Sequence, residues 1–138
     1  MSAYNIFMPN AQRKVLLIIE DEERFAQILK DAFVQEGFIV TVVGSGEEGL
    51  TEALTHHPSA ILLDIMLRGM DGLNVLNRLR QDAWGKRVPV VMLTNLSPDN
   101  KIIERIEQDE PAYYLIKLDS TTEDIVSKVK AALGESVQ

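Results

Sequence analysis

Short apolar runs of strand length alternate with stretches of helical periodicity five times along this chain of 138 residues. The expected strands are residues 15–19, 38–43, 60–63, 88–93 and 112–116. Each run is followed by apolar residues spaced three and four apart, which is the pattern of a helix with one buried face. Right-handed crossovers place each helix against one face of a parallel sheet. The alternation therefore predicts an α/β fold, a doubly wound (βα)5 five-stranded parallel sheet with strand order 2-1-3-4-5.

Local signals predict where several of the helices begin and end. Gly37 and Gly134 follow two of the apolar stripes, and Pro58 follows a third. Ser120 and Glu123 have the spacing of a capping box, so we expect the last helix to begin there.

The composition indicates one globular domain and is compatible with a reducing cytoplasm. Hydrophobic residues make up 46% of the chain and charged residues 25%, which is enough apolar surface for a core. We expect residues 13–138 to form this domain and residues 1–12 to be a flexible N-terminal arm. The net charge of −7 opposes direct binding to nucleic acid or anionic membranes. With no cysteine and no apolar run near the roughly 18 residues of a membrane span, we expect a cytoplasmic protein.

Polar side chains stand at the ends of four of the five expected strands. Glu20 and Asp21 follow the first strand, Asp64 the third, Thr94 the fourth and Lys117 the fifth. Ligands of such sheets bind at the carboxyl ends, at the switch point between strands 1 and 3, so we expect these groups to converge. Two carboxylates about 4 Å apart repel by roughly 4 kcal/mol at an effective dielectric near 20. The cluster therefore calls for a cation, a shared proton or a function.

The donor types favour Mg²⁺ and phosphoryl transfer. Carboxylate oxygens without a nearby histidine or thiolate suit Mg²⁺. Three carboxylates, one Mg²⁺ and the Lys117 ammonium carry no net charge, which leaves the site able to accept a phosphoryl group. An aspartate carboxylate can serve as the nucleophile and form an aspartyl phosphate.

Four motifs, in this order along residues 13–134, resemble the receiver domain of two-component response regulators, a flavodoxin-like, chemotaxis-type fold. They are LIIEDE at residues 17–22, LLDIMLRGMDG at 62–72, MLT at 92–94 and YLIK at 114–117. The resemblance implies that Asp64 is the phosphoacceptor. It also implies that Asp21 binds Mg²⁺ directly, that Glu20 acts largely through water, and that the Met66 backbone carbonyl completes the ligand set.

The resemblance assigns the switch to other residues. Thr94 would bond to the phosphoryl oxygen and draw the following loop inward, and Lys117 would pair with the same group. Tyr114 stands where the family has an aromatic switch residue, whose ring turns inward when Thr94 moves.

Three residues depart from the family pattern. Leu118 stands where a proline in a cis bond usually follows the lysine, and Arg68 replaces a common proline in the loop after Asp64. Asn95 replaces a small residue. Because Met66 and Asn95 are expected to flank the phosphoryl group, we expect them to tune the lifetime of the phosphorylated state.

These features predict a single-domain response regulator, a phosphoacceptor switch whose only activities are self-phosphorylation and self-dephosphorylation. The expected phosphodonor is a sensor histidine kinase or a histidine phosphotransfer protein, and Mg²⁺ is the expected cofactor. A downstream protein would bind the surface formed by the fourth helix, the fifth strand and the fifth helix. We expect a monomer or a weak, phosphorylation-dependent dimer.

Three alternatives remain open from the sequence. An aspartate-nucleophile phosphatase would need a second aspartate two residues after Asp64, where this chain has Met66. A flavin-binding module is opposed by the four consecutive acids at residues 20–23, which repel a phosphate. A degenerate receiver that binds partners without phosphorylation is kept open by Asn95 and Leu118.

Overall fold

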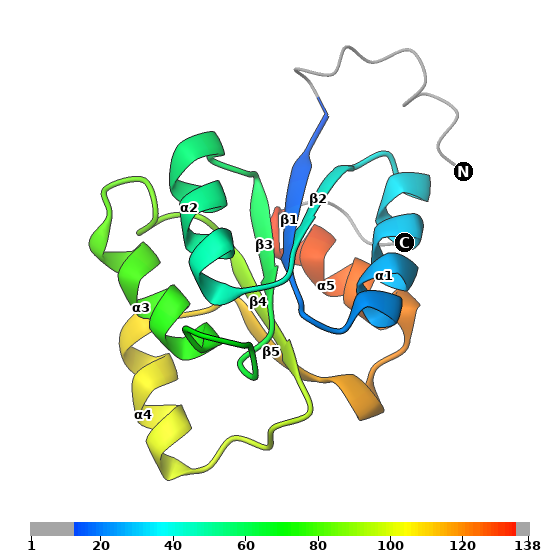
Figure 1. Ribbon diagram of the computed structural model, residues 1–138. Coiled ribbons are helices and arrows are strands. Elements are labelled where there is room, and N and C mark those ends of the chain that lie inside the picture. The colour runs from blue at the N-terminus through cyan, green and yellow to red at the C-terminus, as the bar shows by residue number, and fades with distance from the viewer. Residues whose placement is uncertain (1–12, 135–138) are drawn as a thin grey trace.

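The computed structural model describes residues 13–134, so the expected arm at residues 1–12 lies outside the described residues (Figure 1). Strands and helices alternate along the chain. In order they are β1 (Val15–Ile19), α1 (Glu23–Gln35), β2 (Ile39–Val43), α2 (Gly46–His56), β3 (Ala60–Leu63), α3 (Gly72–Gln81), β4 (Val90–Thr94), α4 (Asn100–Asp109), β5 (Tyr113–Ile116) and α5 (Thr122–Ala132). A short 3-10 turn, η3 (Lys117–Asp119), joins β5 to α5.

The five strands form one parallel sheet in the order β2-β1-β3-β4-β5, which confirms the predicted topology. Ile19 pairs with Leu63 at the ends of β1 and β3. Thr94 pairs with Ile116 at the ends of β4 and β5. This register brings the residues that follow these four strands to the same edge of the sheet.

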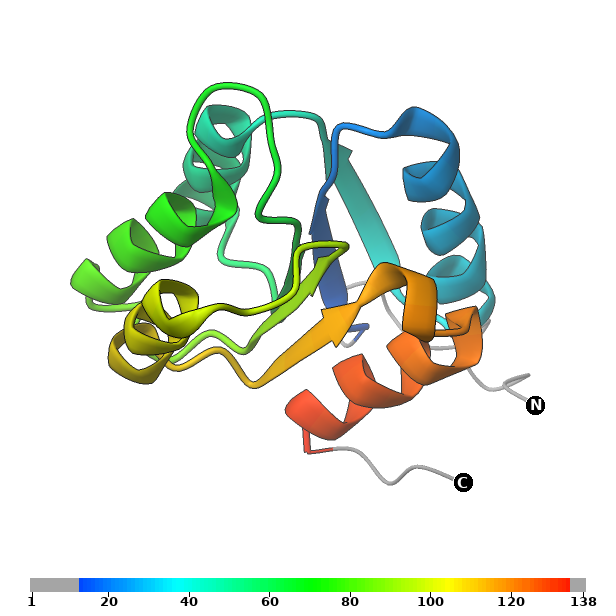
Figure 2. The same cartoon turned by 90° about the horizontal axis from the view of Figure 1, so that it is seen from below.

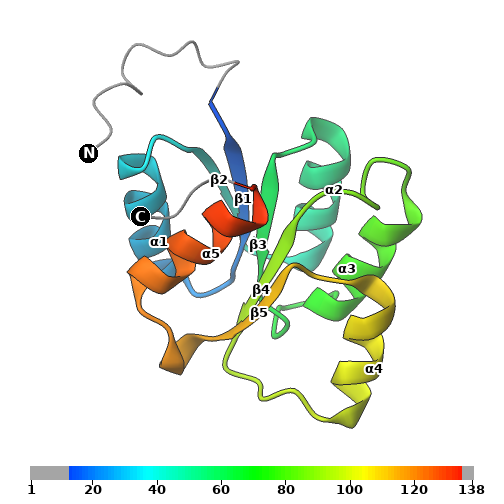
Figure 3. The ribbon, with the colours of Figure 1, turned by 180° about the vertical axis from the view of Figure 1, so that it is seen from behind.

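Helices cover both faces of the sheet. Helices α1 and α5 lie on one face, and α2, α3 and α4 lie on the other (Figures 1 and 3). Alternate residues of β1 enter the two cores: Leu16 and Ile18 pack under α1 and α5, whereas Leu17 and Ile19 pack under the other three helices. Because β1 and β3 are buried on both faces, their aliphatic runs hold the sheet edge rigidly where the acids emerge.

Three strands begin one or two residues later than predicted, at Ile39, Val90 and Tyr113. Phe38 precedes its strand because its ring packs edge-on against Phe33, with centroids 5.3 Å apart, in the turn after α1. The backbone there requires Gly37, whose φ is 92°.

The predicted capping box of the last helix was wrong by one residue. Thr121 is the N-cap, and its side chain and that of Asp124 exchange the two capping hydrogen bonds. The Ser120 hydroxyl instead donates to the Ile116 carbonyl at 2.8 Å, because η3 turns the chain back before α5 starts.

No helix among residues 13–134 is long and apolar enough to cross a bilayer.

Candidate functional site

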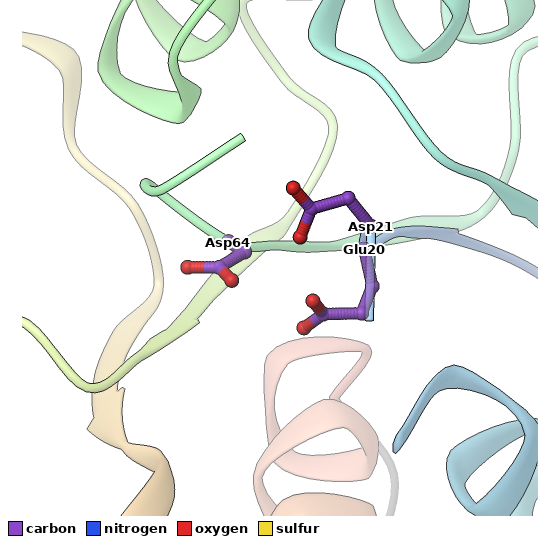
Figure 4. A group of neighbouring side chains, drawn as sticks. All are labelled: Glu20, Asp21 and Asp64. Carbon is purple, nitrogen blue, oxygen red and sulfur yellow. The ribbon is translucent and has the colours of Figure 1, made fainter. Parts of the chain in front are cut away.

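Three carboxylates meet at the carboxyl edge of the sheet, which faces the viewer in Figure 2. Glu20 and Asp21 follow the end of β1 and Asp64 follows the end of β3, and Figure 4 shows the Glu20 and Asp21 side chains extending towards the side where Asp64 lies. One oxygen from each lies within 4.8 Å of the others. Glu20 and Asp64 are only 4% and 5% exposed, whereas Asp21 is more open to solvent. The predicted convergence of these acids is therefore present.

Backbone amides aim two of the carboxylates. The Glu22 N–H donates to Glu20 Oε2 at 3.0 Å, and the Met66 N–H donates to Asp64 Oδ1 at 3.1 Å. The loop after β3 turns back so tightly that a Cβ on Gly72 would stand 2.0 Å from the Asp64 carbonyl oxygen. A glycine at the first residue of α3 is therefore what allows the chain to pass this close to the Asp64 backbone.

Lys117 lies between two of the acids. Its Nζ is 2.7 Å from Glu20 Oε1 and 2.9 Å from Asp64 Oδ2, and 4.8 Å from the centroid of the Phe25 ring. Burial alone would lower the Lys117 pKa, but hydrogen bonds to both carboxylates and their charges raise it above its ordinary value. The ammonium is therefore held charged at the bottom of the site.

For the Glu20 carboxyl, burial is the largest influence on the pKa, and it favours the neutral form. Burial raises the pKa of Glu20, the Lys117 and Glu22 hydrogen bonds lower it in part, and the Asp64 charge raises it again. The net pKa is above the ordinary value of a glutamate. One ammonium does not neutralise the buried acids, so the site retains an excess of negative charge.

The predicted switch residues are connected through Leu96. Thr94 is fully buried at the end of β4, and its Oγ1 accepts a hydrogen bond from the Leu96 N–H at 3.3 Å. The Tyr114 hydroxyl donates to the Leu96 carbonyl at 2.5 Å. Burial raises the Tyr114 pKa, and the charges of Asp64 and Asp99 raise it further. The Tyr114 hydroxyl is thus bonded to the same loop that follows Thr94.

Asn95 and Leu118, two of the departures from the family pattern, contact each other. Asn95 Oδ1 accepts a hydrogen bond from the Leu118 N–H at 3.1 Å, a donor that a proline would lack. The peptide bond before Leu118 is trans, as are all others across residues 13–134. Asn95 therefore joins the loop after β4 to η3, and its predicted place beside the phosphoryl group stays a prediction.

The donor set fits Mg²⁺. The cluster offers only carboxylate oxygens, which are the hard ligands that this ion prefers, and they are close enough to share one ion. The Met66 N–H points to Asp64, and the Met66 carbonyl as a ligand stays a prediction.

Sequence reasoning missed two contacts. The Phe25 ring lies against the Lys117 ammonium, a contact that the apolar spacing of the first helix does not indicate. The Asn95–Leu118 hydrogen bond was also missed. Thr94 pairs with Ile116, so the next residues, Asn95 and Lys117, are expected to lie side by side. That register is the signal that could have suggested a contact between Asn95 and the segment after β5.

Comparisons with known proteins agree with this geometry. A family model described as the response regulator receiver domain matches residues 16–130. The uncharacterized transcriptional regulatory protein YkoG of Bacillus subtilis is 34% identical over 122 residues, which cover 88% of this chain and 51% of that protein. The DNA-binding response regulator MtrA of Mycobacterium tuberculosis is 32% identical over 124 residues, 90% of this chain and 52% of that protein. The chain thus spans about half the length of these curated relatives.

Solved structures show the same fold. The receiver domain of the Francisella response regulator 1452 superposes with a TM-score of 0.78 at 25% identity and covers 88% of this chain and 98% of its own. The receiver domain of the sensor histidine kinase PA1611 from Pseudomonas aeruginosa, solved with a magnesium ion in its active site cleft, gives a TM-score of 0.79 at 24% identity over 89% of this chain and 99% of that one.

Proposed function

This chain belongs to the response regulator receiver domain family, and from that membership we propose that Asp64 accepts a phosphoryl group from the phosphohistidine of a sensor histidine kinase or a histidine phosphotransfer protein. Receiver domains are signalling switches that interact with sensor kinases and are generally not enzymes. The proposal concerns the receiver itself, whether it acts alone or joined to another domain.

The observation that carries the proposal is the convergence of Glu20, Asp21 and Asp64, together with the contacts that Lys117 makes to Glu20 and Asp64. An Asp64 carboxylate oxygen attacks phosphorus as the P–N bond to the donor imidazole breaks, and the imidazole nitrogen keeps that electron pair and takes up a proton. Lys117 neutralises charge on the transferring oxygens, from a position already beside the nucleophile.

The three acids, with the Met66 carbonyl, would hold Mg²⁺, which supplies electrostatic stabilisation of the phosphoryl oxygens when it is bound. The magnesium ion in the PA1611 receiver supports this assignment, together with the all-oxygen donor set of this chain.

The route from chemistry to output runs through the loop after β4. A phosphoryl oxygen that bonds to the Thr94 hydroxyl would draw Thr94 away from the Leu96 N–H, and the Leu96 carbonyl is the acceptor for Tyr114. We propose that this movement alters the α4, β5 and α5 surface for a downstream protein. Because MtrA is a DNA-binding response regulator about twice as long, the expectation that residues 13–138 make no direct contact with nucleic acid also stays a proposal.

Intact-mass measurement after incubation with acetyl phosphate and Mg²⁺ tests the proposal. We expect the protein to gain the mass of one phosphoryl group, and Asp64→Asn or chelation of Mg²⁺ to abolish the gain. A folded wild-type protein that gains no mass from acetyl phosphate or from a phosphorylated histidine phosphotransfer protein would favour the degenerate receiver instead.

A further inference from the structure

A basic side chain lies at the mouth of the acid cluster. Arg68 Nε is 4.0 Å from Asp21 Oδ2, and Arg68 is 80% exposed. Arg68 also lines a cavity of about 390 Å³ together with Glu20, Asp21, the end of β2 and one side of α1, which adds one acid, Glu23, and one base, Lys30, so that their charges cancel. An ion approaching Asp21 from this cavity therefore passes beside the Arg68 guanidinium.

The two cations of the site divide the acids between them. Lys117 contacts the two buried acids, Glu20 and Asp64. Arg68 pairs with Asp21, the acid that is more open to solvent. Three carboxylates, one ammonium and one guanidinium leave a single net negative charge, so Arg68 halves the excess that Lys117 alone would leave.

The backbone around Arg68 is fixed by the start of α2. Arg68 pairs with Ser45 in an isolated parallel bridge. The Met70 N–H donates to Glu47 Oε2 at 3.1 Å. Gly69 has a φ of 73°, and a Cβ there would stand 2.4 Å from Glu47 Oε1. The loop is thus held from both sides, which keeps the base of Arg68 next to the cluster even though its tip is exposed.

On the premise of the proposed function, we propose that Arg68 weakens divalent-cation binding at Asp21 and strengthens recruitment of the anionic phosphodonor. Cation binding is weakened because the Arg68 guanidinium repels another positive charge. Donor recruitment is strengthened because the three acids, Lys117, Arg68 and Mg²⁺ together carry a net charge of +1, whereas without Arg68 they would carry none.

Mg²⁺ titration followed by calorimetry or amide chemical shifts tests the first half. We expect Arg68→Gln to bind Mg²⁺ about two- to fivefold more tightly, with Arg68→Lys close to the wild type. Arg87→Gln is the matched control, because it removes the same charge from an exposed site before β4, at the opposite edge of the sheet. Equal or weaker Mg²⁺ binding by Arg68→Gln would overturn the proposal.

The rate of labelling by acetyl phosphate at saturating Mg²⁺ tests the second half. We expect Arg68→Gln to be labelled about two- to fivefold more slowly at low ionic strength, with the difference shrinking as salt is added. An unchanged rate would overturn donor recruitment. If the wild type is not labelled at all, the proposed function and donor recruitment both fail, while the Mg²⁺ titration still decides the first half.

Discussion

Two buried aspartates stand at opposite edges of the sheet in contrasting surroundings. Asp64, 5% exposed, lies at the carboxyl edge near two other acids and shares one ammonium with Glu20. Asp109, 8% exposed, ends α4 at the amino edge, where the Asn77 side-chain amide donates to both of its carboxylate oxygens at 3.3 and 3.4 Å. One aspartate is crowded by like charge, and the other has a complementary partner.

Arg80 completes the contrast at the amino edge. Its guanidinium donates to the backbone carbonyls of Asp109, Gly85, Val88 and Glu110 at 2.7 to 3.0 Å. Burial lowers the Arg80 pKa, and the charges of Asp109 and Glu110 oppose that shift. The amino edge is therefore arranged for stability, whereas the carboxyl edge keeps uncompensated negative charge that a bound cation would relieve.

The largest expected effect of a substitution is at Arg80. Arg80→Met removes the side-chain N–H groups that donate to the four backbone carbonyls, so we expect the free energy of unfolding to fall by about 3 kcal/mol. Urea denaturation measures this change. Arg78→Met, on the exposed side of the same helix, is the control and should change stability little. A small loss at Arg80 would mean that the amino edge is not the electrostatically satisfied one.

Replacing aspartate by asparagine should change the free energy of unfolding in opposite directions at Asp64 and Asp109. Asp64→Asn removes surplus charge and leaves Lys117 paired with Glu20, so we expect stability without Mg²⁺ to rise by about 1 kcal/mol. Asp109→Asn places an NH₂ group against the Asn77 donor and weakens the attraction to Arg80, so we expect a loss of about 1 kcal/mol.

Thermal unfolding with and without Mg²⁺ measures both variants. The gain of Asp64→Asn should disappear when Mg²⁺ is added, because the wild type alone is then fully stabilised by the ion. Two losses of stability in metal-free buffer would refute the contrast.

One carboxylate at the carboxyl edge has its hydrogen bonds satisfied, that of Asp124 at the start of α5. The Thr121 side chain and Asp124 form a reciprocal cap, so Thr121→Ala should cost about 1 kcal/mol and Ser120→Ala less. Chemical denaturation of the two variants measures the difference. The reverse order would restore the capping box first predicted at Ser120.

The smallest expected effect is a pH dependence confined to alkaline solution. Because the folded-state pKa of Lys117 is raised, its stabilising contribution is complete below the ordinary value of 10.5 and is lost as pH rises through the higher folded-state value. The stability difference between wild type and Lys117→Met should therefore narrow above pH 10.5. A difference that narrows between pH 7 and 9 instead would contradict the raised pKa.

Alternation of strand and helix patterns was enough to predict the sheet order, and the acids at strand ends were enough to predict which side chains would converge. The contact between Phe25 and Lys117 was not predicted, because an aromatic residue on the apolar side of a helix gives the same sequence pattern whether it packs in a core or against an ammonium. The role of Arg80 was not predicted because its four acceptors are backbone carbonyls, two from the segment between α3 and β4 and two from the end of α4. Side-chain contacts of that kind depend on the tertiary structure, and residue spacing along the chain does not predict them.

The amide at position 118 gives this receiver a built-in spectroscopic probe. A proline at that position would be silent in proton–nitrogen correlation spectra, whereas Leu118 carries an observable proton one residue from Lys117 and bonded to Asn95. Its resonance can be followed as ions and small phosphorylated compounds are added, which allows changes around Lys117 and Asp64 to be recorded in solution without an attached label.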